Sequence, residues 1–458
     1  MNKIKSFFQR QVTRIRKNTF VKSVLTLSAG VVVSQAVALC TTPVISRIYT
    51  PEVLGDFSLI TSNATIIGVI VCLGLISAIM IPKDNDEAKG LCRLLTFLII
   101  GLTTILLCVA LAFSPVLQLF TVSLDYRLAC CILWLYVILT NISSVCYSYV
   151  NRQGLYRVLF WNPTIGTVSN AAISIILGLL GCGLWGYICG NLLALILNIL
   201  HMLFHVNPFK GKIAADYRHR TLIKKYKEFP LILFPSNLVG TFAQQMPVQL
   251  IGRFWGSTVL GSYSMCMTIL GLPSKFLAGP VNRVFYKEAT ERYNNGENIG
   301  VFTLKILKAN IKIAIIPIAL LIVLGGPIFS FILGSDWEMA GTFASVMGIY
   351  QVMVFCNSCL AGKFVVINKK KTILFLNIAG VVFYFAVFMV CHLLSFTPLT
   401  SITVFAISGA LFELTDTFIF MKQSRVNLKD YFYFLILYLI IPAVAATGIR
   451  LLLEGAVL

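Results

Sequence analysis

The chain alternates long apolar runs with short polar loops from one end to the other. A helix needs about 20 mostly apolar residues to cross the hydrocarbon core of a bilayer, and these runs reach that length. The pattern therefore predicts thirteen membrane-spanning helices joined by short loops. They are expected near residues 23–47, 56–81, 91–113, 128–150, 158–180, 184–205, 228–252, 259–281, 305–333, 340–365, 372–395, 400–422 and 431–453.

Composition also indicates a membrane protein and argues against a soluble fold. Of the 458 residues, 58% are hydrophobic and 12% are charged, whereas soluble domains carry about 25% charged residues. The net charge of +20 does not indicate nucleic-acid binding, because the basic residues lie in short loops between the apolar runs. In such loops they set the topology and contact anionic lipid. Membrane lipid is therefore an expected partner, and nucleic acid is not.

The loop charges predict a cytoplasmic N-terminus. If residues 1–22 lie inside, then 31 of the 37 lysines and arginines fall in cytoplasmic segments. Positive charge accumulates in cytoplasmic loops, so this distribution supports the predicted helix count and orientation. The cytoplasmic segments are expected at 1–22, 82–93, 151–157, 205–227, 282–308, 363–371 and 422–430.

One stretch occurs twice and predicts an internal repeat. The sequence VLGDFS at 53–58 matches VLGSYS at 259–264, each after the first span of a six-span group. Both groups begin on the cytoplasmic side, which is typical of a parallel repeat. We predict an all-α integral membrane fold with two six-helix lobes around a central cavity and a thirteenth helix. The expected parts are a basic cytoplasmic segment at 1–22, an N-terminal lobe at 23–206, a cytoplasmic linker at 207–227, a C-terminal lobe at 228–423 and an extra helix within 424–458.

The first span of each repeat contains polar side chains that are unusual at membrane depth. Gln35 lies in the first span, and Asn237 and Gln245 lie in the seventh. Such groups either join helices through hydrogen bonds or line a hydrated cavity. Their similar placement in both repeats favours a cavity, so these three residues are candidates for substrate binding.

Basic residues inside or at the ends of spans are a second set of candidates. Lys275 lies well inside the eighth predicted span, where an unpaired lysine costs roughly 2.5–3.5 kcal/mol. It either binds an anionic substrate or extends to the cytoplasmic surface. Arg47 lies at an external helix end and either binds substrate or pairs with Glu52 or Asp56. Two further external cations are candidates for the same substrate role, Arg127 and Arg253.

Two acids stand out in the twelfth predicted span. Glu413 and Asp416 are three residues apart, so they share one face of a helix. They are the expected ion-coupling residues, with one of them carrying a proton or binding sodium. The alternative is a structural salt bridge to a neighbouring lysine.

The sequence contains no motif that indicates an enzyme or a cofactor. The phosphate-binding loop GxxxxGK[ST] of ATPases is absent, and no large polar loop is present to hold a catalytic pair. The one CxxC pair, Cys356 and Cys359, lies inside a predicted span, so we interpret it as two packing cysteines. We therefore expect no enzymatic activity, no cofactor and no metal site.

An ordered set of motifs then suggests a family. These are SRIYTPEVLG at 46–55, IPKD at 81–84, EFPLILFPSNL at 228–238, LGSYSM at 260–265, LPSKF at 272–276, VFY at 284–286 and LGSDW at 333–337. Together, over about residues 28–341, they resemble the O-antigen (polysaccharide) flippases of the multidrug/oligosaccharidyl-lipid/polysaccharide (MOP) exporter superfamily. The resemblance implies twelve spans in two lobes around a central cavity. The thirteenth predicted span departs from that pattern.

The resemblance also implies a function. Members transfer undecaprenyl-diphosphate-linked oligosaccharide, a unit of O-antigen, lipopolysaccharide or a related surface polysaccharide, to the outer leaflet of the bacterial inner membrane by alternating access. A polysaccharide polymerase and a chain-length regulator are implied partners. Two alternatives stay open: a MOP antiporter of another small or lipid-linked solute, and a membrane component of polysaccharide assembly that transports nothing.

Overall fold

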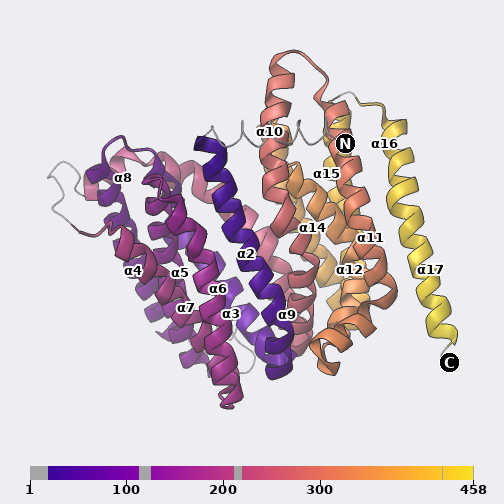
Figure 1. The fold of residues 1–458 in the computed structure, drawn as a ribbon, viewed down its shortest axis with the longest axis horizontal. Helices are drawn as coiled ribbons and strands as arrows, with labels where there is room; N and C mark the ends of the chain where they lie inside the picture. The colour runs from indigo at the N-terminus through magenta and orange to yellow at the C-terminus, as the bar shows by residue number, and fades with distance from the viewer. Residues whose placement is uncertain (1–18, 113–124, 211–218, 425, 457–458) are drawn as a thin grey trace, which may run out of the picture. The chain divides into compact units, whose positions relative to one another are not determined.

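The computed structural model describes residues 19–112, 125–210, 219–424 and 426–456. All regular structure in these residues is helical, which confirms the predicted all-α class (Figure 1). Ten helices of the described residues are long and apolar enough to cross a membrane. The predicted basic segment 1–22 lies outside the described residues except at its end, as does the middle of the predicted linker 207–227.

The first half of the chain forms one long helix for each of the six predicted spans. Five of these helices begin and end near the limits of the predicted spans, whereas α3 ends at Cys72 and the short η1 follows it within the span predicted at 56–81. The elements are α2 (Thr19–Ile48), α3 (Pro51–Cys72), η1 (Leu75–Met80), α4 (Asn85–Ala112), α5 (Tyr126–Arg152), α6 (Tyr156–Leu179), α7 (Gly183–His205) and the short α8 (His219–Lys225).

The second half differs from the prediction at one junction. The predicted spans 228–252 and 259–281 were expected to be joined by a loop, but α9 runs through this region. It is broken only at Gly256, whose φ of 84° and ψ of 178° are not helical. The elements are η3 (Phe229–Leu233), α9 (Phe234–Leu270), η4 (Ser274–Ala278), α10 (Gly279–Asn294), α11 (Ile299–Leu333), η5 (Ser335–Trp337), α12 (Glu338–Cys359), α13 (Lys363–Val366), α14 (Lys370–Leu393), α15 (Pro398–Gln423), α16 (Leu428–Leu435), η6 (Ile436–Ile440) and α17 (Ile441–Ala456).

The chain divides into two compact units. Unit 1 comprises residues 1–41, 67–109 and 134–234, and unit 2 comprises 42–66, 110–133 and 235–458. Unit 2 therefore takes in residues 42–66, which carry the first copy of the repeated VLG stretch, together with the second copy at 259–264. The lobe boundaries given above remain a prediction.

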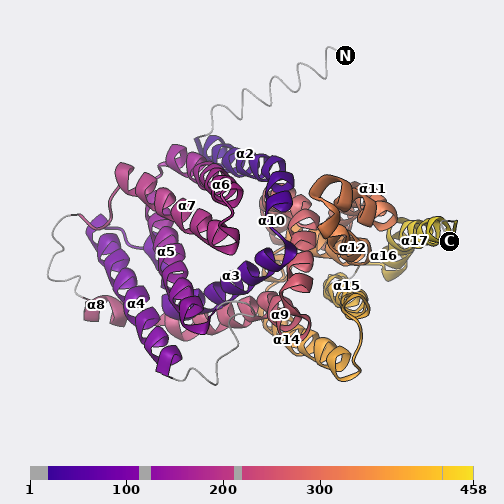
Figure 2. The same cartoon turned by 90° about the horizontal axis from the view of Figure 1, so that it is seen from below.

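In unit 1, helices α6 and α7 pack side by side in both ribbon views (Figures 1 and 2). Small residues allow this close approach, as is common between membrane helices. A Cβ atom added to Gly190 of α7 would lie 2.1 Å from the Ser174 hydroxyl of α6. Nearby, the Asn162 side chain donates a hydrogen bond to the Asn198 carbonyl at 3.1 Å.

In unit 2, α12 lies between α11 and α15 and contacts both. Gly325 of α11 and Gly341 of α12 face each other so closely that a Cβ on Gly341 would lie 2.2 Å from the Gly325 carbonyl oxygen. The predicted thirteenth helix is present as the continuous run α16, η6 and α17, which packs against α11. Lysines of α11 contribute to this packing, because the Lys312 ammonium lies 4.6 Å from the centre of the Tyr438 ring.

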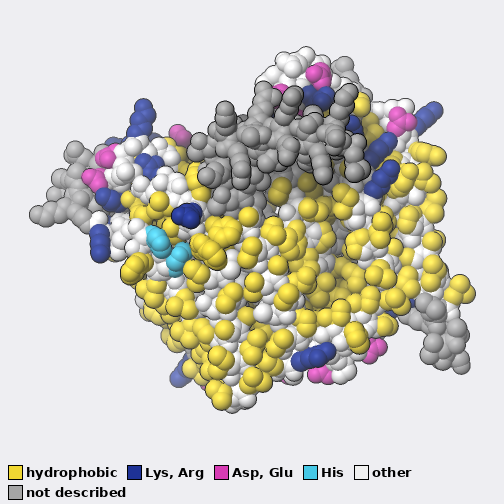
Figure 3. Space-filling model, in the orientation of Figure 1, with side chains coloured by type: hydrophobic (Ala, Val, Ile, Leu, Met, Phe, Trp, Pro, Cys, Tyr) yellow, Lys and Arg dark blue, Asp and Glu magenta, His cyan; other side chains and the backbone are white. Residues whose placement is uncertain are grey.

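The surface fits a lipid environment. Large apolar side chains are exposed along the middle of the long helices. On the face shown in Figure 3, hydrophobic side chains cover most of the area and the charged ones gather toward the helix ends. In water such a surface would drive aggregation, whereas in a bilayer it contacts acyl chains.

Candidate functional site

The stretch 46–59 folds onto two other parts of unit 2. Trp337 donates a hydrogen bond from its indole nitrogen to the Ser46 carbonyl at 2.7 Å, and the Ser46 hydroxyl donates to the Leu333 carbonyl at 2.9 Å. Two motifs of the family resemblance, SRIYTPEVLG and LGSDW, are thus in direct contact. Arg47 is exposed here and donates to the Phe331 carbonyl at 3.2 Å. Its predicted pairing with Glu52 or Asp56 does not occur among the ion pairs of the described residues.

The two copies of the VLG stretch also contact each other. A Cβ atom added to Gly55 would lie 1.9 Å from the Ser257 carbonyl oxygen, and one added to Gly261 would lie 1.7 Å from the Pro51 carbonyl oxygen. Beside this crossing, the Asp56 carboxylate is 1% exposed and accepts a hydrogen bond from the Ser257 hydroxyl. The crossing is therefore closely packed, with no room for side chains at the two glycines.

The other predicted substrate residues are dispersed. Arg127, Arg253, Asn237 and Lys275 are exposed in unit 2, Gln245 is half-buried there, and Gln35 is half-buried in unit 1. Lys275 lies in the π-helical turn η4. Within the described chain, no hydrogen bond joins any two of the seven predicted substrate residues. Their joint role in substrate binding therefore stays a prediction.

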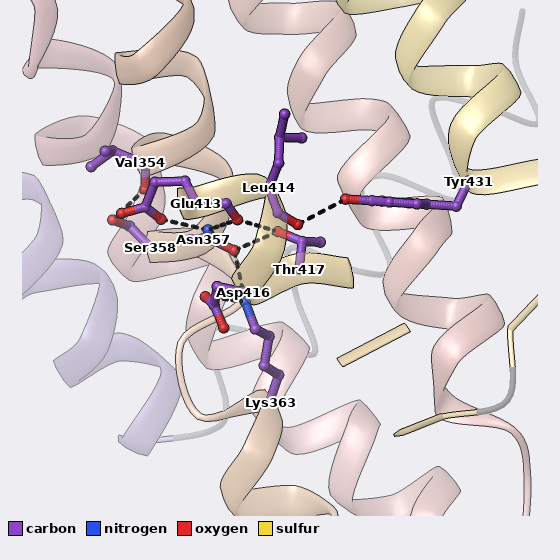
Figure 4. A network of polar contacts seen from close by, with 9 residues as sticks. All are labelled: Val354, Asn357, Ser358, Lys363, Glu413, Leu414, Asp416, Thr417 and Tyr431. Carbon is purple, nitrogen blue, oxygen red and sulfur yellow. Dashed lines mark hydrogen bonds and ion pairs between the residues drawn. The ribbon is translucent and has the colours of Figure 1, made fainter. Parts of the chain in front are cut away.

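The two predicted ion-coupling acids, by contrast, belong to one polar network in unit 2 (Figure 4). Helix α15 places Glu413, Asp416 and Thr417 on one face, and α12 faces them with Asn357. The Asn357 amide donates to the Glu413 carboxylate at 2.6 Å and to the Glu413 carbonyl at 3.1 Å. Its oxygen accepts from the Thr417 hydroxyl at 3.0 Å and from the Lys363 ammonium at 2.7 Å. Asn357 therefore uses its full hydrogen-bonding capacity and links Glu413 to the Lys363 ammonium.

Lys363 is the cation of this network. Its ammonium lies 2.8 Å from the Asp416 carboxylate, and its side chain is 5% exposed. Sequence analysis assigned Lys363 to the cytoplasmic segment 363–371 and did not foresee that its side chain is buried in this network. The chain turns back at Gly362, whose φ of +84° suits glycine. The turn is held by Asn282 of α10, which donates to the Ala361 carbonyl at 2.6 Å.

The network lines a cavity of about 220 Å³ whose wall is formed by residues of α12, α13, α14 and α15 and of the turn between α12 and α13. Lys363, Glu413 and Asp416 contribute one positive and two negative charges to its wall. One oxygen of Asp416, Oδ1, is buried and has no hydrogen-bond partner among the described residues. A buried carboxylate oxygen without a partner is costly, and Oδ1 therefore remains available as a hydrogen-bond acceptor. The alternative role predicted for these acids was a salt bridge to a lysine. Asp416 does form one with Lys363, while its Oδ1 atom has no partner among the described residues.

The neighbouring cysteines pack as expected. Cys356 and Cys359 flank Asn357 on α12, and both are buried free thiols. In the described part of the chain, no group of three or more His, Cys, Asp or Glu side chains is placed to hold a metal ion. The polar groups in the cavity wall are two carboxylates, one amine and the amides of asparagine side chains.

Sequence reasoning missed Asn357, Lys363 and Thr417. The signal for Asn357 was its position inside the CNSC stretch, which was considered only for its cysteines. The signal for Lys363 was its separation from the basic run at 369–371 by five uncharged residues, next to a glycine. Thr417 follows Asp416 directly and was not considered.

The comparisons with known proteins agree with this fold. The family model described as polysaccharide biosynthesis protein matches residues 44–342. No curated protein matches the sequence. Among solved structures, a lipid II flippase, MurJ, in an inward closed conformation superposes with a TM-score of 0.65 at 15% identity, covering 93% of this chain and 98% of that chain.

Two further solved structures share the fold at low identity. An inward-facing MATE-family multidrug resistance transporter of the MOP superfamily matches with a TM-score of 0.64 and 14% identity, over 88% of this chain and 94% of that one. A MOP superfamily transporter from Pyrococcus furiosus matches with a TM-score of 0.56 and 16% identity, over 88% and 95%. The family resemblance of the motifs is confirmed: the chain belongs to the polysaccharide biosynthesis protein family and has the multi-pass helical fold of the MOP-superfamily transporters.

Proposed function

We propose that this protein moves undecaprenyl-diphosphate-linked oligosaccharide from the inner to the outer leaflet of the bacterial cytoplasmic membrane. The observation that carries the proposal is the polar network of Lys363, Glu413 and Asp416 beside its cavity. Charged groups at membrane depth cost free energy, and a transport cycle gives them a use that a scaffold does not. The family supports a polysaccharide cargo, and the shared fold of a lipid II flippase supports a lipid-linked one.

The network supports ion-coupled transport. Its side chains carry a net charge of −1, with one vacant carboxylate oxygen. Uptake of a proton or a sodium ion at Asp416 balances this charge and weakens the hold of Asp416 on Lys363. Loss of the cation restores the pair. The Lys363–Asp416 pair thus has a paired and a released state, and a cation gradient shifts the equilibrium between them. Ion coupling requires a two-state element of this kind.

The remaining predicted residues fit the cargo by their chemistry. A diphosphate needs cations, which Lys275, Arg47, Arg127 and Arg253 supply. Sugars need amide partners, which Gln35, Asn237 and Gln245 supply. The polyprenyl chain is apolar and remains in the bilayer while the polar head crosses. Alternating access of two repeats is the transport mode typical of such folds.

Leaflet exchange in liposomes tests the proposal. The full chain is reconstituted with fluorescent undecaprenyl-diphosphate oligosaccharide, and appearance in the opposite leaflet is followed with and without an imposed proton or sodium gradient. Exchange faster than in protein-free vesicles, accelerated by a gradient, is the expected result. A folded protein that exchanges a drug-like cation but not the lipid-linked sugar would indicate the antiporter alternative, and one that exchanges neither would indicate the non-transporting alternative.

A further inference from the structure

Unit 1 contains a second pocket, far along the chain from the polar network of unit 2. It has a volume of about 620 Å³ and lies where the start of α4, the end of α5 and the end of α7 meet. All three helix ends belong to segments predicted to face the cytoplasm. The predicted topology therefore puts the pocket at the level of the membrane–water boundary on the cytoplasmic side.

The pocket wall contains basic and neutral polar side chains and no acidic one among its described residues. Lys89, Lys210 and His205 are its basic groups, and Asn85 and Gln153 are its amides. Lys89 is held by Asp86 at 2.9 Å, which leaves two of its three ammonium protons for a ligand. This combination of amines and neutral donors is suited to a phosphate group.

The segment that carries Lys210 is fixed in place. After α7 the chain becomes extended at Val206, and the Asn207 side chain accepts a hydrogen bond from the Phe209 amide at 2.8 Å. Arg93 of α4 then donates to the Phe209 carbonyl at 2.9 Å. Lys210 is exposed at the end of this anchored turn, so its ammonium is available to the pocket without ordering a loop.

The surroundings of the pocket favour a lipid over a soluble ligand. Phe204, the residue before His205, is 92% exposed, and Leu200 one turn earlier is 55% exposed. This side of α7 therefore offers apolar surface to acyl chains directly beside the basic pocket. In Figure 3 the exposed histidine side chains lie where the yellow apolar surface meets dark blue Lys and Arg. Basic pockets between membrane helices on the cytoplasmic side are a recognised form of anionic-lipid site.

We propose that this pocket of unit 1 binds the phosphate of an anionic phospholipid, with the acyl chains lying along the exposed apolar side of α7. The site is separate from the polar network of unit 2, and it does not depend on the identity of the transported cargo. Lys89 and Lys210 supply the charge, and Asn85 and Gln153 supply hydrogen bonds.

Native mass spectrometry of the delipidated full chain tests the site. The protein is incubated with phosphatidylglycerol and with phosphatidylcholine, and retained lipid is counted for wild type, Lys89→Gln/Lys210→Gln and the control Lys83→Gln. Lys83 is an exposed lysine at the same helix ends that does not line the pocket. Each lysine lost should weaken phosphatidylglycerol retention roughly fivefold, with phosphatidylcholine retention and the control unchanged.

Three results would overturn the proposal. One is equal phosphatidylglycerol retention by wild type and the double variant. Another is an equal loss in the Lys83→Gln control, which would indicate a diffuse charge effect. The third is release of the lipid by inorganic phosphate, which would assign the pocket to a soluble phosphate compound. Lys210 is exposed and Lys89 is half-buried, so the thermal midpoints of the variants are compared with wild type to show that folding is retained. The readout is lipid retention, so a failure of the transport proposal leaves it unaffected.

Discussion

Gly55 and Gly261 occupy the same position in the two copies of the VLG stretch, and each packs on the backbone that begins the other copy. The neighbour of Gly55 is the Ser257 carbonyl, and the neighbour of Gly261 is the Pro51 carbonyl. Pro51 and Ser257 themselves occupy equivalent places, two residues before each VLG. The contact is therefore reciprocal, as expected for two repeats related by an axis through the crossing point.

This reciprocity predicts that both glycines are needed for stability. Gly55→Ala and Gly261→Ala each place a Cβ within 2 Å of a carbonyl oxygen that belongs to the backbone and cannot rotate away. Overpacking of this kind costs about 1–3 kcal/mol or more. We expect a lowered thermal midpoint for both variants in detergent. Gly240→Ala is the matched control, because a Cβ there meets nothing within 4 Å. Equal stability of all three variants would contradict the reciprocal contact.

Trp337 is expected to hold the end of α2 in place. Trp337→Phe keeps an aromatic ring in a fully buried position but removes the hydrogen bond to the Ser46 carbonyl. A buried acceptor left unpaired costs about 1–3 kcal/mol. Thermal unfolding should show this loss, whereas Trp161→Phe, at a position 53% exposed, should be close to wild type. Equal midpoints for the two variants would show that the hydrogen bond contributes little.

The buried ion pair predicts strongly coupled substitutions. Lys363→Met leaves Asp416 and Glu413 without a cation in the cavity, and breaking such a pair costs about 3–5 kcal/mol. Asp416→Leu leaves the Lys363 ammonium with Asn357 as its remaining hydrogen-bond partner among the described residues. We expect the double variant Lys363→Met/Asp416→Leu to be more stable than Lys363→Met alone. The free energies of unfolding are measured at neutral pH for both single variants and the double variant. If the losses of the two single variants add up to the loss of the double variant, the two groups do not interact.

Ion coupling predicts a specific loss in Asp416→Asn and Glu413→Gln. A single coupled proton converts a gradient of one pH unit into about a tenfold driving force. In the leaflet-exchange assay, exchange by the wild type should be faster with the gradient than without it. Both variants should exchange at the same rate with and without the gradient. Glu291→Gln, on the exposed part of α10, is the control and should keep the response. If the wild type and all variants respond alike, the cluster is structural.

Lys275 is predicted to act on transport without acting on folding. Its side chain is exposed in η4, and Lys275→Ala removes no hydrogen bond or ion pair that the described residues make with it. Losing a charge-assisted contact to a diphosphate costs about 1.5–3 kcal/mol, or on the order of 10- to 100-fold in exchange. Membrane insertion and thermal midpoint should match wild type. Lys287→Ala, on α10, is the control, and exchange as fast in Lys275→Ala as in that control would remove Lys275 from the site.

The helices were predictable because run length and apolar content decide them locally. All thirteen predicted spans contain helix in the structure. The junction in α9 was harder, because RFWGST carries polar residues that resemble a loop, while the chain breaks only at Gly256. A single glycine with positive φ breaks the helix without any loop composition.

The polar network was only half predictable. The three-residue spacing of Glu413 and Asp416 is visible in the sequence, because both lie on one helix. Their partners come from α12 and from the turn after it, and nothing in the local pattern links those segments to α15. Lys363 was assigned to a loop by its nearness to the basic run at 369–371, whereas Gly362 turns it toward Asp416. The periodicity of apolar residues describes single helices, so it cannot predict such contacts between helices.

The charges of the polar network have a consequence for the energy source of the proposed cycle. At full ionisation, one lysine and two carboxylates carry a formal net charge of −1, which one monovalent cation would balance. In a cycle where the cation enters as the diphosphate cargo leaves, both movements carry current of the same sign. Each elementary charge that crosses 100 mV is worth about 2.3 kcal/mol. The transporter would therefore be electrogenic, and the membrane voltage would drive export even where the cation concentrations on the two sides are equal.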